Sequence, residues 1–153
     1  MGFSPVGLLI GLAILAPNAL LAVAAPKGGI PTAGSAGIVL TALERAGQIG
    51  CLVLLAATPA QPTPWLIPAA ASIAIYWALW GRYLRARDFA LLYAPLWRIP
   101  IPMALFPVLA LAAATLNAWS PWLALATAAL AIGHLANSWH VYREIAATRR
   151  SSP

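Results

Sequence analysis

Long apolar runs divide the sequence, and short segments rich in proline, glycine or arginine separate them. Each run approaches the roughly 20 apolar residues that a helix needs to cross a bilayer. The chain has 153 residues, of which 62% are hydrophobic and 8% charged, and a soluble domain of this length cannot bury so much apolar side chain. We therefore predict an all-α, polytopic membrane protein, a bundle of five transmembrane helices. The runs cover residues 3–25, 36–58, 65–84 and 101–118, and a last one extends to residue 142.

The positive charges predict the orientation of this bundle. Five spans place the connections 26–35 and 82–98 on the same side as the C-terminus, and that side then carries all of the nine Lys and Arg residues except Arg45. Because cytoplasmic loops are enriched in Lys and Arg, we expect the N-terminus outside and the C-terminus in the cytoplasm of a bacterial inner-membrane protein. Residues 1–142 form one transmembrane domain in this prediction, and 143–153 form a short basic cytoplasmic tail.

The predicted partners follow from the same charges. The net charge of +6 lies at the ends of spans, so we expect contact with membrane lipids and no nucleic-acid partner. The segment 82–98 mixes arginines with aromatic and aliphatic residues, which is typical of a segment that lies in the headgroup plane. The single cysteine, Cys51, excludes an internal disulfide and is interpreted as a small buried hydrophobe. A homo-oligomer is compatible with this sequence.

Polar residues interrupt the second apolar run. Thr41, Glu44, Arg45 and Gln48 lie in its middle, although the whole chain has only three acidic residues. Ionisable groups at membrane depth cost a few kcal/mol or more, so they usually line a site or a pathway. A plainer alternative is that Glu44 and Arg45 form a structural ion pair, or that Arg45 pairs with a neighbouring helix.

The predicted orientation places several polar side chains at one depth. Glu44 lies roughly 12 Å from the cytoplasmic end of its helix at 1.5 Å per residue, and Asn18, Tyr76 and His134 lie at similar distances in three other spans. Helical spacing adds neighbours on the same faces. These are Thr41, Gln48, Trp77, Trp80 and Asn137. We therefore expect a polar, aromatic-walled pocket that opens toward the cytoplasmic leaflet, although the aromatics are equally compatible with packing and His134 with a simple hydrogen bond to Asn18.

Such a pocket fits one class of reaction. A carboxyl group sheltered in hydrocarbon is favoured in its neutral form unless Arg45 offsets the effect, so Glu44 is a candidate proton donor, with His134 or Tyr76 as a relay. Aromatic faces stabilise cations by about 0.5–2 kcal/mol per contact. An acid, aromatic walls and access from lipid suit protonation of a membrane-dissolved isoprenoid, followed by cyclisation of the carbocation.

Three stretches carry a family resemblance: the residues around Glu44 and Arg45, the segment 100–103, and Gly133 with His134. In them the chain resembles the small bacterial integral-membrane terpene cyclases, and also a group of small actinobacterial membrane proteins. The resemblance implies a metal-independent terpene cyclase with a lipophilic isoprenoid substrate. The aspartate-rich motifs of membrane prenyltransferases are absent, so we expect neither a metal nor another cofactor. The candidate residues are Glu44, His134 and Tyr76 for catalysis, and Asn18, Thr41, Arg45, Gln48, Trp77, Trp80 and Asn137 for substrate binding.

Two other functions stay open at this point. The first is a non-catalytic protein that binds a small molecule or lipid, or couples its transport to protons, with Glu44 and His134 as the coupled site. The second is a structural subunit of a membrane complex, in which the polar layer only locks the bundle.

Overall fold

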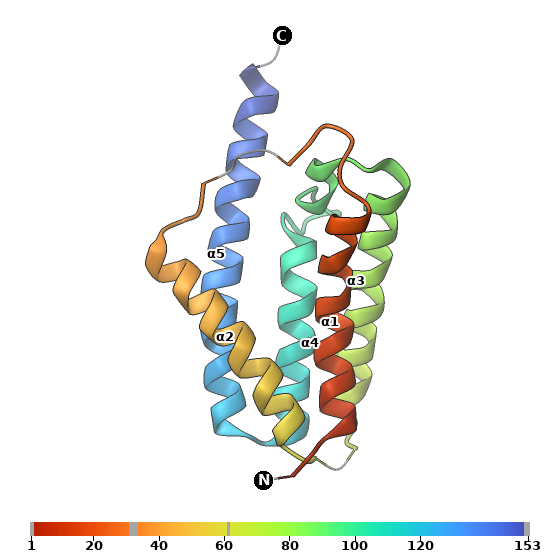
Figure 1. The fold of residues 1–153 in the computed structure, drawn as a ribbon, viewed down its shortest axis with the longest axis vertical. Coiled ribbons are helices and arrows are strands. Elements are labelled where there is room, and N and C mark those ends of the chain that lie inside the picture. The colour runs from red at the N-terminus through yellow and green to blue at the C-terminus, as the bar shows by residue number, and fades with distance from the viewer. Residues whose placement is uncertain (1, 31–33, 61, 152–153) are drawn as a thin grey trace.

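A computed structural model describes residues 2–30, 34–60 and 62–151. The protein is all-α, and five α-helices and one short 3-10 helix account for its regular structure within these residues (Figure 1). The elements are α1 (Pro5–Val23), α2 (Ile38–Ala57), α3 (Leu66–Ala86), η1 (Phe89–Leu92), α4 (Pro102–Ala118) and α5 (Pro121–Ser151). The all-α prediction is confirmed.

Proline and capping residues define several helix starts. Pro5, Pro102 and Pro121 each begin a helix, where the missing N–H costs no hydrogen bond and the fixed φ favours the helical turn. Ser4 caps α1, because its hydroxyl accepts a hydrogen bond from the backbone N–H of Gly7 at 3.1 Å. These local signals explain why the first four helices start and end within two residues of the predicted runs.

The helices form two groups that meet at one end (Figure 1). The helix α2 crosses α5 diagonally, while α3 packs against α4, and α4 joins the two groups by also contacting α5. The start of α1 lies against the end of α2, where the backbone N–H of Ser4 donates to the carbonyl of Ala56 at 2.8 Å. Toward their other ends α1 and α2 diverge (Figure 1).

The two ends of the bundle differ in what they contain. The α1–α2 connection, the segment between α3 and α4, and the C-terminus lie at one end, whereas the N-terminus lies at the other (Figure 1). Two hydrogen bonds tie the end of α3 to the start of the α1–α2 connection: the Tyr83 hydroxyl donates to the Ala24 carbonyl at 2.6 Å, and Arg87 Nε donates to the Ala25 carbonyl at 3.0 Å. The connections at this end, together with the last parts of α3 and α5, carry all Lys and Arg residues of the sequence except Arg45, so this is the basic end.

Two glycines allow α2 and α5 to touch through their backbones. A Cβ atom at Gly47 would overlap the backbone of Leu130, and one at Gly133 would overlap the backbone of Leu40 and Glu44. Small residues are typical of helix pairs that approach this closely. Gly47 and Gly133 therefore determine the spacing of α2 and α5, and with it the spacing of their polar side chains.

The prediction of five transmembrane spans is not supported by helix length and composition. Among the described residues two helices, α1 and α2, are long and apolar enough to cross a membrane, while α4 is a shorter apolar helix of 17 residues. Polar residues lower the mean hydropathy of α3 and α5: Arg82 and Arg85 lie near the end of α3, and His134 lies within α5. In addition, α5 does not end near residue 142 but continues to Ser151, so the predicted tail is largely helical; residues 152–153 lie outside the described part.

We expect Gly47→Ala to destabilise the protein by about 1–3 kcal/mol, because the added methyl group must push α2 away from α5. Gly81→Ala is the matched control, since a Cβ there meets nothing within 4 Å and alanine favours a helix over glycine by roughly 0.5–1 kcal/mol. Thermal unfolding in detergent measures both changes. Equal effects of the two substitutions would contradict the proposed close approach.

Candidate functional site

A cavity of about 350 Å³ lies between the two helix groups. Its walls come from α1, α2, α3, η1, α4 and α5, and it separates two clusters of buried side chains, one around Leu111 and Leu123 and the other around Tyr83 and Trp80. The volume lies at the lower end of the roughly 300–1,000 Å³ that is typical of small-molecule sites. This cavity is the candidate functional site.

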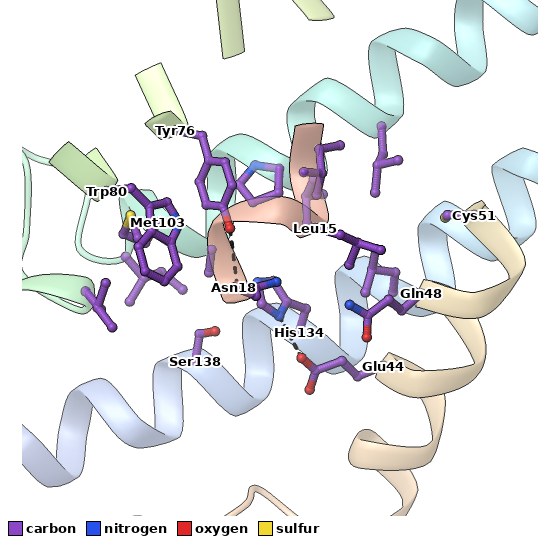
Figure 2. Close-up of a pocket in the computed structure, with 18 of the residues that line it drawn as sticks. Leu15, Asn18, Glu44, Gln48, Cys51, Tyr76, Trp80, Met103, His134 and Ser138 are labelled. Atoms are coloured by element: carbon purple, nitrogen blue, oxygen red, sulfur yellow. Dashed lines mark hydrogen bonds and ion pairs between the residues drawn. The ribbon is translucent and has the colours of Figure 1, made fainter. Parts of the chain in front are cut away.

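The cavity is apolar along most of its wall, and polar side chains gather along one part of it. Leucines and isoleucines of α1, α2, α4 and α5 supply the apolar wall. Asn18, Tyr76, Glu44, His134 and Ser138 converge from four helices (Figure 2). A few convergent polar groups in an apolar pocket are the usual composition of a ligand site.

The strongest polar contact joins α2 to α5. Glu44 Oε1 lies 2.7 Å from His134 Nδ1, and Glu44 Oε2 accepts a hydrogen bond from Asn137 Nδ2 at 2.6 Å. The His134 and Glu44 side chains keep 30% and 22% of their surface exposed, so this pair faces the cavity rather than being sealed in the core. One proton lies between Nδ1 and Oε1, and Nε2 remains as the second ring nitrogen of His134.

Asn137 connects this pair to the chain that precedes α2. Its Oδ1 accepts a hydrogen bond from the backbone N–H of Ala36 at 3.0 Å, while its Nδ2 donates to Glu44. Asn137 is not part of the cavity lining. It therefore positions Glu44 rather than contacting a ligand.

Tyr76, Asn18 and Trp80 form a second polar and aromatic group on the α1 and α3 side of the cavity. The Tyr76 hydroxyl points at Asn18 Oδ1 over a long 3.5 Å contact (Figure 2), and the rings of Tyr76 and Trp80 meet edge to face at 6.4 Å between centroids. Both rings are buried, with 4% and 2% of their surface exposed. Because they pack against one another, their positions in the wall are fixed.

Eight of the ten candidate residues lie at or next to the cavity, and two do not. Glu44, His134, Tyr76, Asn18, Arg45, Gln48 and Trp80 line it, and Asn137 supports it. Thr41 instead donates its hydroxyl to the Gly37 carbonyl at 3.0 Å, and Trp77 is 42% exposed, with its indole N–H on the Ala13 carbonyl at 2.9 Å. Both residues belong to helices that line the cavity, but their side chains point away from it. Helical spacing alone does not determine which part of a helix faces a neighbouring helix.

The pairing of Glu44 differs from the simplest alternative. Within the described residues, the partners of its carboxylate are His134 and Asn137, and Arg45 makes no ion pair with it. The reason is geometric, because Glu44 faces α5 whereas Arg45, the next residue along the helix, is exposed. A structural Glu44–Arg45 ion pair is therefore not observed.

The sequence analysis did not predict the lining residues that lie outside the polar layer. Phe89, Leu92 and Tyr93 of the segment around η1 line the cavity, as do Met103 and Leu111 of α4. Burial raises the pKa of the Tyr93 phenol, and the nearby Glu44 carboxylate raises it further, so Tyr93 stays protonated at neutral pH. The aromatic content of the segment 82–98 was the available signal, but it predicted contact with headgroups instead.

The described residues contain no group of three or more His, Cys, Asp or Glu side chains that could hold a metal ion. His140 pairs with Glu144 at 3.1 Å on the exposed part of α5, away from the cavity. The Glu44–His134 pair thus offers two donors, fewer than the three protein ligands of a typical catalytic zinc site.

No protein-family profile matches this chain, and neither the curated proteins nor the solved structures include a match.

The Asn137 contacts lead to a testable effect on stability. We expect Asn137→Ala to lower the free energy of unfolding by about 1–3 kcal/mol, because it leaves Glu44 Oε2 and the Ala36 N–H without their partners. Thr41→Val is the control, since the lost hydroxyl bonds only to an exposed carbonyl on the same helix, and its effect should stay within about 0.5 kcal/mol. Thermal or urea unfolding compares the two variants.

Proposed function

We propose that the chain forms a five-helix bundle in the bacterial inner membrane, with the N-terminus outside and the C-terminus in the cytoplasm. Support comes from large apolar side chains that stay exposed on every α-helix, which a soluble monomer seldom displays in such number. Examples are Leu9, Ile49, Ile67, Leu109 and Leu125, each more than 40% exposed. The gathering of the basic connections at the end that holds the C-terminus also favours this orientation.

Labelling of single cysteines tests this topology in a Cys51→Ala background. With five spans, Gly28→Cys and Arg85→Cys should be protected from an impermeant maleimide in intact cells, whereas Ser120→Cys should react. With α1 and α2 as the only spans, Arg85→Cys and Ser120→Cys would lie on the same side and label alike. The second pattern would exclude the five-span arrangement.

We further propose that the cavity binds a lipophilic prenyl chain and catalyses its cyclisation, with protonation as the first step. The observation that carries this proposal is the Glu44–His134 pair, which brings a proton to the polar side of an otherwise apolar cavity. General acids of this kind accelerate a reaction typically by about 10²–10⁴-fold. Water-poor surroundings also limit capture of a carbocation by water.

The proposed reaction consumes no net proton. A proton leaves the Glu44–His134 pair and forms a C–H bond at an alkene carbon, which leaves a carbocation on the neighbouring carbon. A second alkene attacks the cation, and one C–C bond forms. The charge then lies on the other carbon of the second alkene. Loss of a proton from an adjacent carbon of this cyclic cation forms a new C=C bond and returns the proton to the pair, so the reaction is an isomerisation and consumes no co-reactant.

Aromatic rings are available to stabilise the cation after protonation. Tyr76, Trp80, Phe89 and Tyr93 all contribute to the cavity wall. A cation over the face of such a ring gains about 0.5–2 kcal/mol. Four rings from α3 and the η1 segment thus offer successive positions for a charge that moves along the folding prenyl chain.

The acid itself is the first test of this function. We expect Glu44→Gln and His134→Gln each to lower turnover of linear prenyl substrates by about 10²-fold or more, as for removal of a general acid. Membranes that carry each variant are incubated with linear prenylated compounds, and the products are analysed by mass spectrometry and NMR.

Glu144→Gln and His140→Gln are matched controls for these variants. They remove the same groups from a second His–Glu pair, at 3.1 Å, on the exposed part of α5. Turnover should be unchanged in both. Cyclisation that survives in Glu44→Gln would rule out the proposed acid.

A non-catalytic role in binding or proton-coupled transport is the second candidate. It is favoured by one observation, namely that both Glu44 oxygens already have hydrogen-bond partners, so the pair is held as a polarised site and not as an isolated acid. In this case a ligand binds saturably and is recovered unchanged. If Glu44→Gln lowers thermal stability and alters neither binding nor turnover, a structural role in a membrane complex remains.

A further inference from the structure

Arg45 occupies the rim of the cavity. It contributes to the lining and yet is exposed, as expected for a residue at the mouth and not within the cavity. It is also the sole Arg or Lys residue among the described lining residues. The mouth therefore combines a permanent positive charge with an apolar interior.

The guanidinium of Arg45 makes no direct contact with a carboxylate, and the Glu44 carboxylate acts on it only through space. It forms no hydrogen bond or ion pair with any residue in the described part of the chain. The adjacent carboxylate of Glu44 is held by His134 and Asn137 instead. Because α2 is long and apolar enough to cross a membrane, a charge there is costly and typically marks a ligand site or a pathway.

The depth of Arg45 allows it to reach a headgroup. In the structure α2 begins at Ile38, two residues after the start of the predicted run. Arg45 therefore lies seven residues into the helix, roughly 10 Å from its first residue at 1.5 Å per residue. The long arginine stem can direct its charge toward the interface while its carbon atoms remain in apolar surroundings. The guanidinium can thus meet an anionic group whose apolar part lies deeper.

The volume of the cavity limits the size of the apolar group that it can hold. At about 30 Å³ for each water-sized group, a cavity of this size holds on the order of a dozen non-hydrogen atoms. A single chain of roughly ten to fifteen carbons matches that content, and two chains do not. Burial of such a chain provides most of the affinity, because the hydrophobic contribution grows with the apolar surface that is removed from water.

We propose that the cavity binds a single-chain amphiphile whose anionic head group, a phosphate or a carboxylate, pairs with Arg45 while its apolar chain fills the cavity. This inference rests on the proposed function, in which the cavity receives a lipophilic molecule, and it adds the chemical class of the head group. Arginine suits this role because its planar guanidinium donates two parallel hydrogen bonds to a phosphate or a carboxylate.

A matched pair of ligands tests the head group. Geranyl monophosphate and geraniol share one ten-carbon chain and differ in the anion, and inorganic phosphate supplies an anion without a chain. Equilibrium binding of each is measured on the full chain in nanodiscs of zwitterionic phosphatidylcholine. We expect geranyl monophosphate to bind the unmodified protein at least tenfold more tightly than geraniol, and inorganic phosphate to compete only at far higher concentration.

Arg45→Gln removes the charge and keeps the length of the side chain. We expect it to weaken binding of geranyl monophosphate by about 10–100-fold, as for loss of a charge-assisted hydrogen bond, and to change binding of geraniol less than threefold. Unchanged geraniol binding shows that the variant is folded. Arg45→Lys should retain part of the effect, and Arg143→Gln, which removes an exposed charge away from the cavity, should bind both ligands as the unmodified protein does.

Several outcomes overturn the inference. Equal affinities for the two geranyl ligands, or equal losses for both in Arg45→Gln, would show that Arg45 does not recognise an anion. Inorganic phosphate that competes as well as geranyl monophosphate would show that the chain contributes nothing. If neither geranyl ligand binds the unmodified protein, the proposed function itself fails, and the two failures are thereby distinguished.

A further binding experiment identifies the molecule that supplies the anion. Nanodiscs that contain phosphatidylglycerol place an anionic phospholipid beside the mouth. If this lipid displaces geranyl monophosphate from the unmodified protein but has no effect on the residual binding of Arg45→Gln, the anion at Arg45 comes from a two-chain bilayer lipid, and the single-chain part of the inference is wrong. If it displaces nothing, the single-chain assignment stands.

Discussion

The close contact between α2 and α5 determines the rest of the structure. Gly47 and Gly133 let the two backbones approach until neither position has room for a Cβ atom. At this spacing Glu44 meets His134 and Asn137 at hydrogen-bond distance across the interface. A side chain at either glycine would separate the helices, and the polar contacts would lengthen with them. The helix contact and the candidate site are therefore one feature of the fold.

The cavity follows from the way in which α2 leaves this contact. The end of α2 lies against the start of α1, through Ser4 and Ala56, but the other end lies against α5, so α1 and α2 diverge (Figure 1). Residues of α4 and of the η1 segment complete the wall of the cavity. A pocket with one polar wall and one aromatic wall results from two well-packed helix groups joined at an angle.

The sequence predicted much of this arrangement and failed at specific places. Apolar runs bounded by proline located the helices, and shared depth along the helices brought Asn18, Glu44, Tyr76 and His134 together correctly. Thr41 and Trp77 were assigned to the pocket because they share a helical stripe with lining residues, yet they point elsewhere. A stripe about 100° wide is enough to identify a buried face, but it does not separate the cavity from the neighbouring helix interface. The wall from α4 carries no polar signal in the sequence, and the mixed arginine and aromatic content of the η1 segment predicted headgroup contact instead, so both walls were missed.

By itself the sequence determined the all-α class, the approximate ends of most helices, and the presence of an acid, a base and an amide in one layer of apolar helices. These properties depend on local composition and on spacing along one helix, which a single chain reveals. Only the tertiary structure decided that Glu44 pairs with His134 and Asn137 and not with Arg45, and that Arg45 is left at the rim of a cavity. Those outcomes depend on the angle and the distance between helices, and these are set by backbone contacts at Gly47 and Gly133 between residues far apart in the chain.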